Sequence, residues 1–140
     1  HLSKVLEAHG FEVISTDLIY RGFGDPEPLD FLKDTLEDFE GDIITNPPYK
    51  YALEFIQRAL ESVQTGRKVA MFLKLTFLEG KKRKEFFLHN PPKTIYVSSS
   101  RLNCAMNGDF EKYTSNNAIC YAWFVWEKGF RGDPVIKWIN

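Results

Sequence analysis

Apolar positions along the chain switch between helical and strand-like spacing, and this pattern predicts an α/β fold. Residues 51–63 form the clearest predicted helix, because their apolar side chains recur close to the helical period. Shorter helices are predicted over 3–9, 29–39 (helical at least in part) and 81–89. Predicted strands cover 11–16, 42–45, 68–77, 94–98, 118–126 and 135–139, and a long polar loop covers 101–117.

The order of these elements predicts a mostly parallel sheet. Helices and strands alternate as far as about residue 98, which is typical of parallel strands joined by right-handed crossovers. The last two strands have no helix between them, so we expect an antiparallel edge. Open α/β sheets bind ligands at the carboxyl ends of their strands. Polar residues that end predicted strands are therefore candidates for a site, and these are Asp17, Asn46 and either Lys74 or Thr76.

Composition narrows the class of protein. The 140 residues are 44% hydrophobic and 15% aromatic, which suits one domain over 1–140 with a packed core. We expect neither a membrane span nor a signal peptide, because apolar runs are short and the chain opens on an amphipathic pattern. Cys104 and Cys120 are too few for a disulfide framework, and no histidine has a partner at metal spacing. We therefore expect a reduced, cytoplasmic protein that holds no metal.

Charge is balanced over the whole chain but not along it. Residues 1–63 carry five basic and thirteen acidic side chains, whereas residues 64–140 carry thirteen basic and six acidic ones. A basic half can follow the phosphates of a nucleic acid, although ordinary solvated faces would give the same counts. Candidate phosphate contacts are four consecutive residues and one later arginine: Lys81, Lys82, Arg83, Lys84 and Arg101. Basic residues at a helix start oppose the helix dipole, which favours a use other than stability.

The most specific feature is Asn46-Pro47-Pro48-Tyr49, which lies between a short apolar strand and the clearest helix. A planar exocyclic amine is a poor nucleophile, because its lone pair is delocalised into the ring. The Asn46 side-chain oxygen and the Pro47 carbonyl can accept hydrogen bonds from both N–H groups of such an amine and so free the lone pair. The prolines fix the backbone so that this carbonyl faces the pocket. Tyr49 offers a ring on which a base can stack.

In this context the tetrapeptide resembles the catalytic motif of S-adenosylmethionine-dependent amino methyltransferases, written as Asn or Asp, Pro, Pro, then Tyr or Phe. More narrowly, residues 107–138 resemble small bacterial and phage-borne adenine-specific DNA methyltransferases. The resemblance implies a Rossmann-like methyltransferase fold that transfers a methyl group to the exocyclic amino group of adenine in DNA. It implies that Asn46, Pro47, Pro48 and Tyr49 form the catalytic motif. The structural alternative is a Pro-Pro turn that only ends a buried strand.

Positions upstream of the motif are candidates for holding the cofactor, S-adenosylmethionine. Asp17 ends a predicted strand, where an acidic residue in nucleotide-binding α/β folds accepts hydrogen bonds from ribose hydroxyls. The resemblance implies that Asp17 holds the ribose and that Leu18 and Asn46 also border the cofactor. It further implies that Asp30 meets the adenine amine of the cofactor, while Phe31 packs on its ring. The alternatives are turn or helix caps for both acids and a core position for Phe31.

The resemblance also assigns residues to the target base. A base inside a duplex must be turned out before chemistry on it can occur, and aromatic stacking offsets part of the cost. Phe110 and Tyr113 lie in the long polar loop, where the family often places an aromatic residue for this purpose. Tyr49 would face the same base. Loop aromatics also commonly anchor a loop to the body of the protein.

One family feature is missing from the sequence. The glycine-rich cofactor loop would lie immediately before residue 1, and Gly22-Phe23-Gly24 follows the acidic strand instead. We therefore expect a domain that is N-terminally incomplete, without its first strand and that loop. Beside DNA methylation, the open alternatives are methylation of RNA or of protein glutamine and a non-catalytic nucleic-acid-binding remnant. A homodimer and a separate specificity subunit are both compatible with the sequence.

Overall fold

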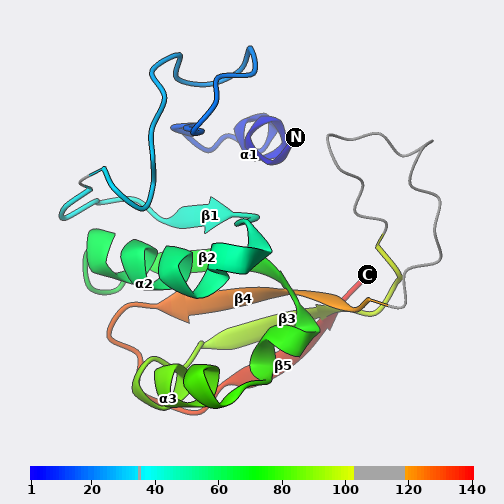
Figure 1. The fold of residues 1–140 in the computed structure, drawn as a ribbon. Coiled ribbons are helices and arrows are strands. Elements are labelled where there is room, and N and C mark those ends of the chain that lie inside the picture. The colour runs from blue at the N-terminus through cyan, green and yellow to red at the C-terminus, as the bar shows by residue number, and fades with distance from the viewer. Residues whose placement is uncertain (35, 103–118) are drawn as a thin grey trace.

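A computed structural model describes residues 1–34, 36–102 and 119–140 (Figure 1). Its helices are α1 (Leu2–Ala8), α2 (Ala52–Ser62) and α3 (Lys81–His89), with 3₁₀ turns η1 (Tyr49–Tyr51) and η2 (Leu75–Leu78). Its strands are β1 (Ile43–Thr45), β2 (Lys68–Lys74), β3 (Thr94–Ser98), β4 (Tyr121–Glu127) and β5 (Val135–Ile139). Among the described residues, no helix combines the length and the apolar character needed to cross a membrane.

The five strands form one mixed sheet in the order β1-β2-β4-β3-β5. β1 runs parallel to β2 and β3 runs parallel to β5, whereas β4 pairs antiparallel with both β2 and β3. The chain is therefore a mixed α/β domain in which only one strand of the sheet runs against the others. The predicted antiparallel edge is wrong, because β4 lies inside the sheet. Phe124 and Trp126 on β4 are buried, and a strand this apolar is stabilised by neighbours on both sides.

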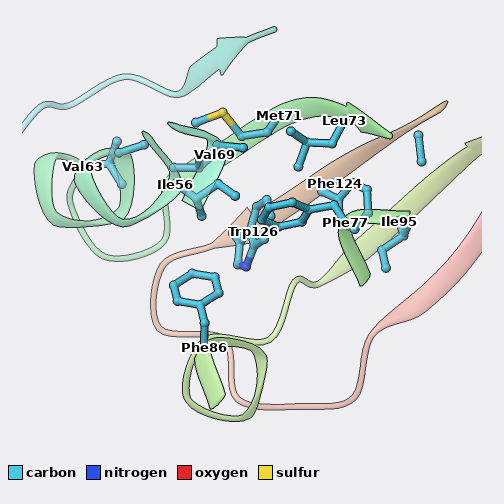
Figure 2. Packing of buried hydrophobic residues seen from close by; sticks show 13 residues of the cluster. Ile56, Val63, Val69, Met71, Leu73, Phe77, Phe86, Ile95, Phe124 and Trp126 are labelled. Atoms are coloured by element: carbon cyan, nitrogen blue, oxygen red, sulfur yellow. The ribbon is translucent and has the colours of Figure 1, made fainter. Parts of the chain in front are cut away.

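The hydrophobic core lies between the sheet and the two longer helices. Figure 1 shows α2 and α3 on the same face of the sheet. Ile56 of α2 is fully buried, and Phe86 of α3 points toward Trp126 in the close view of Figure 2, with ring centroids 6.4 Å apart. The Trp126 indole N–H donates to the Asn90 carbonyl oxygen at 3.0 Å, just after α3 ends. Burial of these large side chains against one sheet face stabilises this half of the molecule.

Several predicted elements are confirmed close to their predicted bounds. The predicted helices over 51–63 and 81–89 correspond to α2 and α3, and the strands over 94–98 and 135–139 are β3 and β5. The predicted strand over 68–77 ends earlier, at Lys74, because the chain then turns through η2. The strand predicted over 118–126 corresponds to β4, which begins at Tyr121; residues 119 and 120 are not part of it, and residue 118 lies outside the described residues.

The predicted strand over 11–16 is wrong. Residues 11–17 form no regular secondary structure, and Phe11 and Ile14 are 63% and 71% exposed. A strand is stabilised by ladder hydrogen bonds and by a buried face. The isolated segment has neither a paired strand nor a buried face among the described residues.

The predicted helix over 29–39 is also wrong for the residues that the structure describes there, 29–34 and 36–39, where a turn and bends form instead. Aspartate side chains compete for the backbone here: the Leu32 N–H donates to Asp30 at 3.1 Å, and the Asp30 N–H donates to Asp34 at 2.6 Å. At the far end, Phe39 forms a parallel bridge with Val63. The bridge requires an extended backbone at Phe39, which is the last residue of the predicted helix.

Candidate functional site

The Asn46-Pro47-Pro48-Tyr49 segment lies where β1 ends, and β1 and β2 point the same way (Figure 1). The register pairs Thr45 with Met71, so Asn46 is level with the second half of β2. Pro47 is buried and Pro48 leads into η1, which passes directly into α2. Neither proline has an N–H with which to extend the ladder, so the strand stops at this point. The motif therefore occupies the carboxyl edge of a parallel strand pair, as predicted.

Two hydrogen-bond acceptors at this edge have no partner among the residues that the structure describes. The Asn46 side chain is exposed, and no hydrogen bond joins it to another residue in the described ranges. The Pro47 carbonyl likewise accepts no backbone hydrogen bond there, whereas the Tyr51 N–H donates to the next carbonyl, that of Pro48, at 2.9 Å. The Asn46 amide oxygen and the Pro47 carbonyl oxygen thus belong to consecutive residues, and each is a hydrogen-bond acceptor.

An aromatic cluster borders this edge on the sheet face away from α2 and α3. Phe72 stacks on Tyr121 at 5.3 Å between centroids and contacts Trp123 at 5.1 Å; these three residues form the aromatic row. The Tyr49 ring lies 6.4 Å from that of Tyr121, and the Lys74 ammonium lies 5.2 Å from the centre of the Tyr49 ring. Tyr49 thus continues the aromatic row at the site.

The sequence pattern alone does not assign the aromatic row to the site. It places Phe72, Tyr121 and Trp123 in predicted strands and gives them no role in function. The signal that could have found them is strand alternation: Phe72 shares a face with Lys74, whereas Met71 and Leu73 face the helices and are buried.

Asp17 and Leu18 lie in the irregular segment, so Asp17 does not end a strand, contrary to the prediction. The Asp17 carboxylate accepts from Arg21 at 2.5 Å and from the Ile19 N–H at 3.3 Å. Both partners of the ion pair are more than half exposed. Such a pair is worth little and can exchange for another donor.

Asp30 and Phe31 also have local partners. Asp30 pairs with Lys33 at 3.1 Å, and the hydrogen bond from that lysine, with one from the Leu32 N–H, lowers the pKa of the carboxyl. Phe31 stacks on Phe55 of α2 at 5.1 Å between centroids and packs against the core. These contacts match the alternatives for both residues, a local cap and a core position.

Asp17 and Asp30 have a side-chain type that could hold a nucleoside, because carboxylates accept hydrogen bonds from hydroxyl and amino donors. The structure does not bring these two residues together with Asn46. Among the described residues, no hydrogen bond, ion pair or ring contact joins Asp17 or Asp30 to Asn46. The structure therefore places the Asn46 motif at the end of β1 and does not join Asp17 or Asp30 to it.

The basic run divides into two kinds of side chain. Lys81, Lys82 and Lys84 are exposed at the start of α3. Arg83 instead donates to the Thr76 and Phe77 carbonyls, each at 3.2 Å, and its guanidinium lies 4.8 Å from the centre of the Phe77 ring. Arg101 is exposed. Phe110 and Tyr113 lie outside the described residues.

Two further features bear on the chemistry. No cluster of metal-ligating side chains occurs within the described ranges. A hollow of about 380 Å³ lies between α2 and α3 near Trp126, away from the motif. On its rim, Arg131 donates to the His89 carbonyl and Lys128 to the Val63 carbonyl, so these cations are committed to the fold.

No protein-family model matches this chain, and no curated protein matches it.

Proposed function

We propose that the chain belongs to an S-adenosylmethionine-dependent methyltransferase that modifies the exocyclic amino group of adenine in DNA. One observation carries this proposal: at the carboxyl edge of β1, the Asn46 side chain and the Pro47 carbonyl are acceptors on consecutive residues, and neither has a hydrogen-bond partner among the described residues. That edge is where open α/β sheets bind ligands. The motif resembles the catalytic segment of amino methyltransferases, and this resemblance is the reason for proposing methyl transfer to an amino group.

The acceptor pair suits an amine with two N–H groups. One N–H donates to the Asn46 side-chain oxygen and the other to the Pro47 carbonyl oxygen, which favours the tetrahedral nitrogen that has a free lone pair. Asn46 is neutral, so it orients and polarises the amine rather than removing its proton. S-adenosylmethionine supplies an electrophilic methyl group on a sulfonium. The nitrogen lone pair would form the new N–C bond as the S–C bond of the sulfonium breaks, which would leave a neutral thioether. The methylated nitrogen would then lose one proton to solvent, and positioning of the amine would supply much of the rate.

Aromatic and basic groups around the motif favour a nucleic acid as the substrate. Tyr49 has an aromatic ring 39% exposed at the motif, on which a turned-out base can stack. The exposed lysines at the start of α3 follow η2, which leaves the same carboxyl edge of the sheet. Phosphate contacts from such lysines would hold the strand while the base enters the site.

A second candidate function is nucleic-acid binding without catalysis. Asp17 and Asp30, the residues expected to hold the cofactor, are satisfied by Arg21 and Lys33 and do not contact Asn46. This candidate predicts salt-sensitive DNA binding with no methyl transfer.

Substitution of Asn46 separates these functions. With tritiated S-adenosylmethionine and DNA, RNA and protein acceptors, we expect label on DNA from the natural chain. Asn46→Ala should lower the rate by roughly 100-fold to 1000-fold, as expected when one preorganised hydrogen-bond partner is removed. DNA affinity, measured by fluorescence anisotropy, should stay unchanged.

Asn46→Asp is the matched control, since it keeps a side-chain oxygen acceptor and should lose less activity than Asn46→Ala. Label that appears only on protein would contradict the DNA proposal. Label on DNA that is equal for the natural chain and Asn46→Ala would contradict the role of Asn46.

A further inference from the structure

Three lysines in the described ranges are half-buried, and two of them have oxygen partners. Lys93 pairs with Glu127 at 3.0 Å. Lys128 donates to the Val63 carbonyl at 2.7 Å. Lys74 is the third, and no oxygen among the described residues pairs with its ammonium. Arg58 Nε is the buried side-chain nitrogen without a partner in the described ranges, so the Lys74 ammonium is still reached by solvent. It is therefore available to an acceptor that comes from outside the described residues.

The position of Lys74 places that partner beside the candidate site. Lys74 is the last residue of β2, the strand next to β1, and its Cα pairs with that of Tyr121 across the sheet. The Lys74 ammonium lies over the Tyr49 ring, 5.2 Å from the ring centre. A ring face attracts a cation but offers no oxygen lone pair. The ammonium therefore has donor capacity left at the point where a base on Tyr49 would carry its sugar and phosphate.

We propose that Lys74 binds the phosphodiester group beside the target base, so that the site selects a nucleotide within a strand. This inference rests on the proposed function, because it uses Tyr49 as the surface on which the base stacks. An anionic phosphate oxygen forms a charge-assisted hydrogen bond with an ammonium, which is stronger than a contact with a neutral ring. Lys74 exchanges the Tyr49 ring for the phosphate when DNA binds. The exchange opens that face of Tyr49 to the base.

The phosphate role is tested by removing the two charges separately. Lys74→Met keeps an unbranched apolar side chain, shorter by one atom, and removes the charge. The DNA probe is a fluorescein-labelled duplex in which one adenine lies opposite an abasic site, which lowers the cost of turning the base out. A second duplex carries neutral methylphosphonates on both sides of that adenine. Binding is measured by fluorescence anisotropy over a series of salt concentrations.

We expect Lys74→Met to weaken binding to the phosphodiester duplex by about fivefold to tenfold near 0.1 M salt, and to lower the salt slope by about one. The natural chain should bind the methylphosphonate duplex more weakly than the phosphodiester duplex, by a similar factor. For Lys74→Met, the change from the phosphodiester to the methylphosphonate duplex should weaken binding by less than a further twofold, because the two changes remove the same contact. Lys137→Met, which removes an exposed lysine on β5, is the matched control and should change affinity less than twofold.

The proposal would be overturned if Lys74→Met and the natural chain bound the phosphodiester duplex with equal affinity. Thermal melting curves show whether both proteins are folded. Independent losses from the lysine and from the methylphosphonates would also overturn the proposal. Lys74→Arg keeps the charge and should retain affinity within about threefold. Failure of the proposed function is seen separately: if the natural chain never transfers a methyl group while the binding results hold, Lys74 binds the phosphate of a strand that this protein does not methylate.

Discussion

At the scale of single residues, Arg83 shows how a sequence run conceals different roles. Its neighbours in the run are exposed to solvent, whereas Arg83 folds back on the two 3₁₀-turn carbonyls and the Phe77 ring. The sequence predicted four equivalent phosphate contacts, because a run of basic letters does not say which side chain faces the body. Asn46 is the opposite case: the prolines that follow it restrict the backbone, so its position at the strand end could be predicted.

Arg83→Ala should lower the free energy of unfolding by about 1–2 kcal/mol, because two hydrogen bonds from a charged group and a cation–π contact are lost. Lys82→Ala removes an exposed side chain with the same charge and should change it by less than about 0.5 kcal/mol. Urea unfolding of both variants measures the difference. Equal stability of the two variants would mean that Arg83 does not anchor η2.

At the scale of elements, the sequence predicted those whose signals are local. α2 has an apolar face at helical spacing, and the Asn-Pro-Pro segments that end β1 and follow α3 stop their elements through the missing proline N–H groups. The segments at 11–16 and 29–39 have apolar residues at suitable spacing, but their described residues do not form the predicted strand and helix. The first has no strand partner among the described residues, and the second loses its backbone donors to aspartate side chains. Pairing partners and competing side-chain bonds are not visible in one stretch of sequence.

The α2 face offers the clearest test of packing. Ile56 is fully buried between α2 and the sheet. Ile56→Ala should cost about 2–5 kcal/mol of unfolding free energy, because it removes buried surface and leaves a cavity. Glu54→Ala on the exposed side of the same helix is the control and should cost less than about 0.5 kcal/mol. A small effect of Ile56→Ala in chemical denaturation would contradict the packing of α2 on the sheet.

At the scale of the whole molecule, the candidate site and a group of exposed lysines both follow strands that end at one edge of the sheet. β1 and β2 both end there, and the chain leaves β2 through η2 into the lysine-rich start of α3. The mixed sheet and its core were predictable as a class from element order, but the place of β4 inside the sheet was not. Strand order depends on which strands pair, and adjacency in sequence is an imperfect guide to pairing.

Lys81→Gln with Lys82→Gln should weaken DNA binding and lower the salt slope by up to about 1.8, which is the sum for two phosphate contacts on a duplex. Lys68→Gln with Lys137→Gln removes the same charge from exposed positions at the start of β2 and on β5, and should change the slope little. Fluorescence anisotropy over a salt series compares the pairs. Identical slopes for both double variants would mean that net charge, rather than the start of α3, governs binding.

The most direct test of methylation at Asn46 identifies the product itself. The natural chain and Asn46→Ala are each incubated with adenine-containing DNA and S-adenosylmethionine that carries a trideuterated methyl group, and the digested nucleosides are analysed by mass spectrometry. We expect trideuterated N6-methyladenine from the natural chain and its near absence from Asn46→Ala. DNA that stays unlabelled, or a label on a base other than adenine, would contradict the proposed function.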